Sequence, residues 1–229
     1  MKTTPKKISA QDKKITALFD THYPDPKSEL NFSNTYQLAI SVLLSAQCTD
    51  KKVNEVTKIL FQNYPDFIAL QKASLKKIET IIRPINYYKT KSRHLVELAE
   101  RVVRDFASEF PLNRIDAISL PGIGNKTANV ILGEMKIEAT LPVDTHVFRV
   151  SQRLGWAKGT TPAAIEMQLK ARFPADMWRN LHHWLILHGR KLCKAQRPLC
   201  EECPLIKLCP TARSRKIKAY EPAKNQLLK

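Results

Sequence analysis

The chain has 229 residues, 43% of them hydrophobic, which is enough for a folded protein with a sizeable core and excludes a disordered chain. Its formal net charge of +17 makes nucleic acid the leading partner, because neutralising phosphates releases counterions; a basic protein without such a partner is the alternative. No apolar stretch is long enough to span a bilayer and no secretory signal is recognisable, so we expect a cytoplasmic protein whose thiols stay reduced.

The predicted elements are all helices, since no segment alternates convincingly with the period of two that is typical of strands. An almost continuous apolar run indicates a buried helix over residues 36–47, and Cys48 in the same apolar segment is expected to be a small core residue. The clearest helix spans residues 90–106, where apolar side chains recur at helical spacing. The other expected helices are a short one over 114–119, a longer one from Asn125, one from Pro162 and one over 178–188.

Local signals mark one helix start and the end of the chain. Thr161 is the expected N-cap of the helix that begins with Pro162, a residue favoured at the first helical position, and Pro174 marks the end of that run. Residues 213–229 are polar and basic, and we expect them to form a loose tail.

Four of the five cysteines lie close together with the spacing C-x6-C-x2-C-x5-C, at Cys193, Cys200, Cys203 and Cys209. Four thiolates are the ligand set of a [4Fe–4S] cluster. Zinc also accepts four thiolates, although its common sites use two C-x2-C pairs, so the spacing predicts a metal and leaves its identity open. A metal here would also hold rigid a basic loop that contains Lys191, Lys194, Arg197 and Lys207, and this loop could contact phosphates.

The segment 120–124, Leu-Pro-Gly-Ile-Gly, joins two predicted helices. Gly122 and Gly124 allow positive φ and leave backbone amides bare at a helix N-terminus, where a phosphate oxygen binds well. An ordinary helix–helix turn is the alternative. Lys126 follows in the first turn of the second helix, and its amine suits either a simple phosphate contact or attack at a sugar C1′ to form a Schiff base. Attack requires a neutral amine, which the positive helix end and a dry pocket would favour.

Asp144 is the second candidate for chemistry. Its place in the segment 142–146, Pro-Val-Asp-Thr-His, favours a helix N-cap over a catalytic role. Eighteen residues separate Asp144 from Lys126, so the spacing alone does not show that the two side chains meet.

Taken together, these motifs resemble one family, the endonuclease III family. The segments that carry the resemblance are LPGIGNKTANV at 120–130, VDTHVFRV at 143–150, HHWLILHGR at 182–190 with the cysteines after it, and LSAQ at 44–47 ahead of Thr49 and Asp50. The resemblance extends over about residues 25–209. It implies an all-α, two-domain helix-hairpin-helix DNA glycosylase fold, with a six-helix barrel over 28–138, an iron–sulfur cluster domain from 1–27 and 139–212, and the tail 213–229.

The resemblance also implies an activity. The protein would be a base excision repair enzyme, releasing oxidised pyrimidines as an N-glycosylase and cutting 3′ to abasic sites by β-elimination as an AP lyase. Lys126 takes the nucleophile position, Asp144 that of the assisting carboxylate, and Gln47 that of a residue that fills the gap left by a flipped base. The four cysteines would hold a [4Fe–4S] cluster. The implied partner is double-stranded DNA with damaged pyrimidines or abasic sites, bound by a nucleoid-associated monomer.

Three positions depart from the family pattern. Asn125 stands where arginine is more usual, which affects a phosphate contact. Asn86 and Tyr87 stand where glycine and an apolar wedge are frequent, although Tyr87 can still stack on a base. Cys48 replaces a small alanine-like residue.

Three other functions are weighed against the bifunctional enzyme. A monofunctional glycosylase, such as the adenine glycosylase acting at mismatches, usually lacks the lysine and carries a further C-terminal domain. A DNA-binding module without catalysis would not need both Lys126 and Asp144. An electron-transfer protein of the small ferredoxin type has little chain beyond its cluster loops, whereas most of this chain lies elsewhere.

Overall fold

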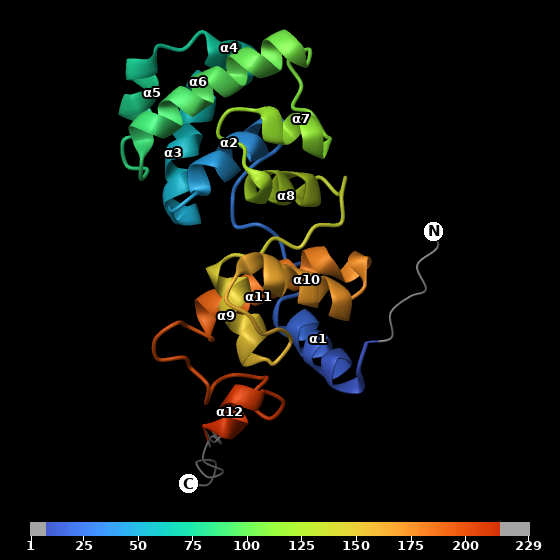
Figure 1. The fold of residues 1–229 in the computed structure, drawn as a ribbon. Coiled ribbons are helices and arrows are strands. Elements are labelled where there is room, and N and C mark those ends of the chain that lie inside the picture. Colours follow the sequence, from blue (N-terminus) through green and yellow to red (C-terminus); the bar gives the residue numbers. More distant parts are fainter. Residues whose placement is uncertain (1–7, 216–229) are drawn as a thin grey trace, which may run out of the picture. The chain divides into compact units, whose positions relative to one another are not determined.

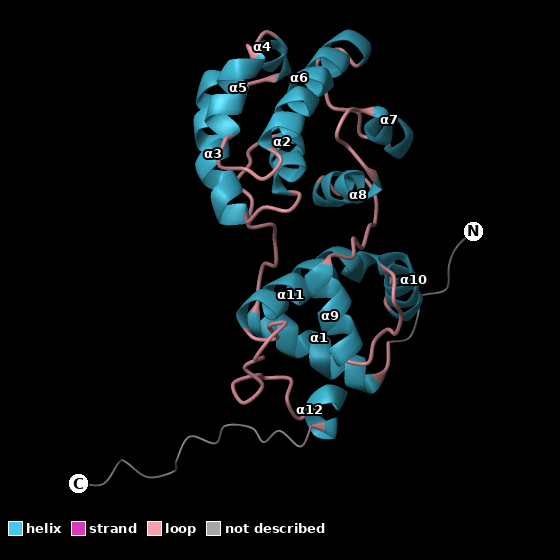
Figure 2. Ribbon diagram, turned by 60° about the vertical axis from the view of Figure 1, so that its left-hand side comes forward, coloured by secondary structure: helices cyan, strands magenta, loops and turns pink. Residues whose placement is uncertain are grey.

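The computed structural model describes residues 8–215, and every regular element among them is a helix (Figure 1, Figure 2). The all-α prediction is therefore confirmed. The described residues divide into two compact units, one made of residues 28–140 and the other of residues 8–27 and 141–215. Each unit has its own hydrophobic core. Within 8–215, none of the helices combines the length and the apolar character needed to cross a membrane.

The unit 28–140 is built around one long helix, α6, which packs against α2, α4 and α5 (Figure 1). Leu95, Leu98 and Val102 are completely buried at helical spacing, and their burial stabilises this packing. The bounds of its helices are α2 Thr35–Ser45, α3 Asp50–Asn63, α4 Phe67–Gln71, α5 Leu75–Ile82, α6 Tyr88–Asp105, α7 Arg114–Ser119 and α8 Asn125–Glu134.

The second unit gathers an N-terminal helix with the C-terminal part of the chain. Phe19 lies at the centre of its core, stacked on Trp184 and edge-on to Trp156. The buried carboxylate of Asp12 accepts hydrogen bonds from the Trp156 indole and pairs with Arg172, which compensates for its loss of water. The bounds of its helices are α1 Ala10–His22, α9 Thr145–Arg153, α10 Pro162–Arg172, the 3₁₀ turn Ala175–Met177, α11 Trp178–Lys191 and α12 Pro210–Ser214.

Several expected helix limits are confirmed. The short helix 114–119 has the predicted bounds, and α8 begins at Asn125. Thr161 caps α10, because its hydroxyl accepts a hydrogen bond from the Ala164 amide. The helix expected over 178–188 continues three residues further, to Lys191.

Other expectations need correction. The helix predicted over 36–47 ends at Ser45, because the chain turns at Gln47 with φ of 57°. Cys48 therefore lies in this turn, half-buried against the core, and is not a helical core residue. The helix predicted from residue 90 begins at Tyr88. Of the expected tail, Arg213 and Ser214 belong to α12, and residues 216–229 lie outside the described part of the chain.

Candidate functional site

The hairpin between α7 and α8 depends on one glycine for its shape. Gly122 has φ of 75°, and a Cβ atom there would lie 2.8 Å from Leu43 Cδ1 and 3.0 Å from His94 Cβ. The hairpin therefore fits tightly against α2 and α6, and any other residue at this position would be strained. Gly124 differs, because its φ is −87° and nothing lies within 4 Å of where its Cβ would be. Of these two glycines, only Gly122 uses the positive φ that glycine allows.

Gly124 nevertheless leaves the start of α8 open. It is the N-cap of this helix and contributes no side-chain acceptor to the first amides. The first amides of a helix have no acceptor within the helix, and they lie at its positive end, which is the arrangement that binds a phosphate oxygen. The helix itself is held by Arg114 of α7, which donates to the Asn129 side chain at 2.5 Å and forms an ion pair with Glu138.

Lys126 is the second residue of α8, in the first turn as predicted. Its side chain is exposed. The dry pocket expected to favour a neutral amine is therefore not formed around it by the described residues.

Gln47 and Tyr87 come together in the unit 28–140. Gln47 is exposed in the turn after α2, and Tyr87 is 65% exposed immediately before α6. The Asn86 side-chain amide donates a hydrogen bond to the Gln47 carbonyl at 2.6 Å, and so links the two turns. Gln47 and Tyr87 have φ of 57° and 60°, a left-handed conformation that costs a non-glycine residue roughly 1 kcal/mol or more and is concentrated at functional sites.

Asp144 is the N-cap of α9, as its sequence context favours. Its Oδ1 accepts hydrogen bonds from the amides of His146 at 2.9 Å and Val147 at 2.8 Å. His182 of α11 fixes the preceding segment through a contact between its Nδ1 and the Pro142 carbonyl at 2.8 Å. The carboxylate is half-buried, and its Oδ2 is not used in the cap. Asp144 and Lys126 belong to different units.

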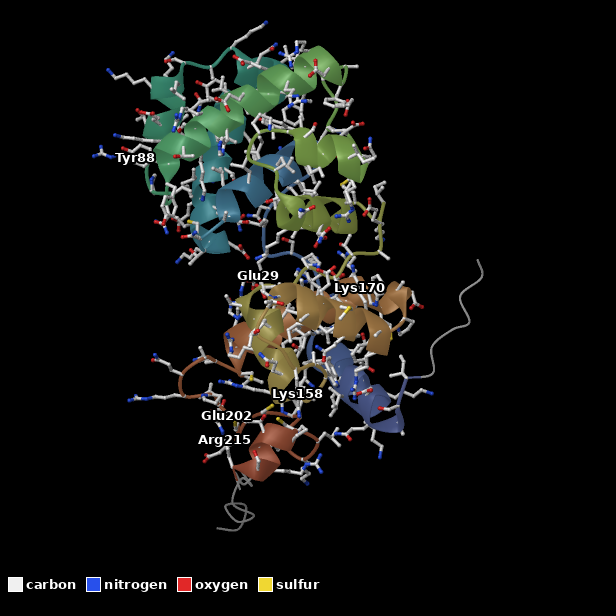
Figure 3. The ribbon with its side chains drawn as sticks, viewed as in Figure 1. Glu29, Tyr88, Lys158, Lys170, Glu202 and Arg215 are labelled. Atoms are coloured by element: carbon white, nitrogen blue, oxygen red, sulfur yellow. The ribbon has the colours of Figure 1, made fainter. Side chains whose placement is uncertain are left out.

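The four clustered cysteines surround one cavity. All four line it, together with the arginine side chains of Arg153 and Arg215, the latter labelled in Figure 3. No group of three or more Cys, His, Asp or Glu side chains within residues 8–215 is spaced to hold a single metal ion. Burial raises the pKa of the Cys203 thiol to about 12, so a thiolate there needs a positive partner such as iron. Four thiols around a shared cavity fit an iron–sulfur cluster.

Two arginines of α9 hold the cysteine loop, and the sequence alone did not single them out. Arg153 donates to the Lys194 carbonyl at 2.7 Å and lies 3.3 Å from the Cys193 sulfur. Arg149 donates to the Cys193 carbonyl at 3.0 Å. Their spacing of four residues places both on one face of α9, which is the signal that could have identified them. The expected basic side chains of the loop, Lys191, Lys194, Arg197 and Lys207, are all exposed.

Comparison with known families agrees with this geometry. Residues 40–175 match the family described as HhH-GPD superfamily base excision DNA repair protein. Residues 193–209, from the first to the last clustered cysteine, match the iron–sulfur binding domain of endonuclease III. The fold and the site therefore define a helix-hairpin-helix protein of base excision DNA repair with an iron–sulfur cluster.

Individual relatives narrow this class. Endonuclease III of Synechocystis is 41% identical over 193 residues, which cover 84% of this chain and 88% of the relative. Endonuclease III of Bacillus subtilis is 40% identical over 197 residues, which cover 84% of this chain and 89% of the relative. A structure of a trapped endonuclease III–DNA covalent intermediate is 36% identical, with a TM-score of 0.83, and the match covers 91% of this chain and 100% of that one. A thermostable thymine-DNA glycosylase, 21% identical with a TM-score of 0.76, shares the fold over 89% of this chain and 97% of its own.

The chain belongs to the endonuclease III family. It is accordingly an enzyme, a DNA glycosylase and AP lyase of base excision repair, and its cofactor is a [4Fe–4S] cluster.

Proposed function

We propose that Lys126 is the nucleophile of this enzyme and that Asp144 is the carboxylate that assists it. The observation that carries the assignment is the position of Lys126, exposed in the first turn of α8 directly after the tightly packed Gly122 hairpin. A duplex whose phosphate binds the open amides of α8 brings its sugar within reach of this amine. The bound DNA then supplies the exclusion of water that the protein alone does not give Lys126.

The proposed reaction proceeds at the sugar C1′. The neutral Lys126 amine attacks C1′, the bond to the damaged base breaks, and the base leaves with the bonding electrons and takes up a proton. Asp144 stabilises the positive charge that develops on the sugar and accepts the proton from the attacking amine. The Lys126 nitrogen then forms a double bond to C1′ as the C1′–O4′ bond breaks, and O4′ takes up the proton held by Asp144, which gives a protonated Schiff base. Loss of a C2′ proton then expels the 3′ phosphate, which is β-elimination.

Four further residues serve DNA binding in this proposal. Gly122 shapes the hairpin and Gly124 leaves the α8 amides free for a phosphate. Gln47 fills the gap left by the extruded base, and Tyr87 stacks on a neighbouring base, since both side chains are exposed in adjoining turns.

Cys193, Cys200, Cys203 and Cys209 are the proposed ligands of the cluster, because all four line one cavity. When bound, the cluster cross-links the loop through four iron–thiolate bonds. The loop then presents Lys191, Lys194, Arg197 and Lys207 as a rigid basic surface for phosphates.

The proposed substrate is double-stranded DNA that contains an oxidised pyrimidine or an abasic site. We assign the six-helix barrel to residues 28–138 and the cluster domain to residues 1–27 and 139–212. The enzyme acts on the nucleoid as a monomer in this proposal.

A product assay tests the function. The purified enzyme is incubated with a duplex that carries one thymine glycol, and released base and cleaved strand are measured separately. We expect both products from the wild type, with strand cleavage 3′ to the lesion. Lys126→Ala is expected to lose strand cleavage and to keep its iron and its affinity for DNA. Base release without strand cleavage by the wild type would instead indicate a monofunctional glycosylase. Binding of the duplex without either product would indicate a DNA-binding module.

A further inference from the structure

Lys91 is a buried lysine in the unit 28–140. It is 6% exposed, and its ammonium donates hydrogen bonds to the carbonyls of Leu44 at 2.8 Å and Ala46 at 2.6 Å. These carbonyls end α2, where the partial negative charge of the helix favours a cation. Burial lowers the pKa of Lys91, because removal from water disfavours the charged amine. The two hydrogen bonds fix the turn 46–48, which contains Gln47.

Asn86 holds the same turn from the other side. Its side-chain amide donates to the Gln47 carbonyl at 2.6 Å. Asn86 is not among the residues with positive φ, so a side chain is accommodated there without backbone strain. It stands where the family resemblance leads one to expect glycine, which has no side chain to make this bond. The Asn86 side chain therefore makes a hydrogen bond that glycine at this position would lack.

We propose that Asn86 and Lys91 are positioning residues that hold Gln47 in its DNA-binding conformation before DNA arrives. The inference rests on the proposed role of Gln47 at the extruded base. Gln47 has a left-handed backbone conformation that a non-glycine residue keeps only when its surroundings impose it. The hydrogen bonds from Asn86 and Lys91 hold the turn, together with the bond from the Cys48 amide to the Ser45 carbonyl. Holding the turn in advance lowers the entropic cost of ordering Gln47 on binding.

The arrangement also couples Gln47 to Tyr87. Asn86 is the neighbour of Tyr87, and Lys91 lies in the first turn of α6, which begins at the Tyr88 labelled in Figure 3. The Lys91 backbone amide donates to the Tyr87 carbonyl at 3.0 Å, while its side chain holds the end of α2. The backbone turns that carry Gln47 and Tyr87 are thereby linked to each other.

A double-mutant cycle between Gln47 and Asn86 tests the inference. Binding of Gln47→Ala, Asn86→Ala and the double variant is measured on a duplex with a stable abasic-site analogue and on the same duplex undamaged. Asn86→Ala removes one exposed hydrogen bond, and we expect it to weaken binding to the abasic duplex about threefold and to leave binding to the undamaged duplex nearly unchanged. In the Gln47→Ala background the same substitution is expected to have no further effect.

Asn63→Ala is the matched control. Asn63 is an exposed residue of the same unit whose side-chain amide also donates to a backbone carbonyl, that of Ile59 at 2.9 Å. Asn63 is the last residue of α3, about 20 Å along the helix from Asp50, the first residue of α3, which follows the turn that contains Gln47. We expect this variant to bind both duplexes as the wild type does. If Asn63→Ala and Asn86→Ala lose affinity for the abasic duplex equally, the Asn86 effect is general destabilisation and the inference is overturned.

The remaining outcomes separate this inference from the proposed function. Gln47→Ala could weaken binding to the abasic duplex, and Asn86→Ala could weaken it further by the same factor in the double variant. That result would support the role of Gln47 in DNA binding and would show that Asn86 does not act through Gln47. If Gln47→Ala binds the abasic duplex as the wild type does, the proposed role of Gln47 fails, and the inference fails with it. Lys91→Met removes both hydrogen bonds to α2, and wild-type affinity in a folded Lys91→Met protein would overturn the part assigned to Lys91.

Discussion

Asp144 has two separable roles, one in the stability of α9 and one in the proposed chemistry. Its Oδ1 accepts two backbone amides at the start of α9. Asp144→Ala removes this cap, and loss of a cap costs about 1 kcal/mol. For a chain of this size, that corresponds to a fall in Tm of about 2–4 °C. Asp144→Asn keeps an equally good capping residue and loses only the charge near the helix end, so its Tm is expected to change by less than about half of that.

Thermal unfolding followed by circular dichroism, with strand cleavage assayed on the same samples, separates the two roles. We expect both variants to lose most cleavage, because both lack the carboxylate, while Asp144→Ala loses more stability than Asp144→Asn. Equal falls in Tm for the two variants would refute the capping interpretation. Full cleavage by Asp144→Asn would refute the need for a charge at this position.

Three other predictions follow from the hairpin, the charge and the cluster. Gly122→Ala is expected to lower the free energy of unfolding by more than about 1 kcal/mol, because its Cβ would meet Leu43. Gly124→Ala has open space around the added Cβ and should unfold like the wild type. Equal denaturant midpoints for the two variants would contradict the tight packing assigned to Gly122. DNA affinity measured by fluorescence anisotropy should fall about a hundredfold between 50 and 200 mM salt, and a flat response would contradict phosphate-dominated binding. Removal of iron by a chelator should weaken DNA binding, and unchanged affinity with the rest of the protein still folded would exclude a binding role for the basic loop.

The sequence predicted the local features that depend on short-range rules. The N-cap at Thr161, the start of α8 and the first-turn position of Lys126 each follow from residues within a few positions of one another. The cysteine spacing likewise predicted one shared site, because short loops limit how far the four sulfurs can separate.

The sequence could not predict contacts between residues far apart in the chain. Lys91 occupies a core position of α6, four residues before Leu95, and a lysine at such a position signals a buried partner without identifying the α2 carbonyls. The turn at Gln47 was missed for the same reason, because the hydrogen bonds that end α2 come from residues about forty positions later. The apolar run continued to residue 47, and tertiary contacts overrode it.

Borohydride trapping on a duplex with one thymine glycol tests the central claim most directly. Reduction of a Schiff base converts it into a stable covalent bond between protein and DNA. We predict that the wild-type enzyme forms this adduct, that peptide mapping locates it on Lys126, and that Lys126→Ala forms none. An adduct on another residue, or base release by the wild type without any adduct, would contradict the assignment of Lys126 as the nucleophile.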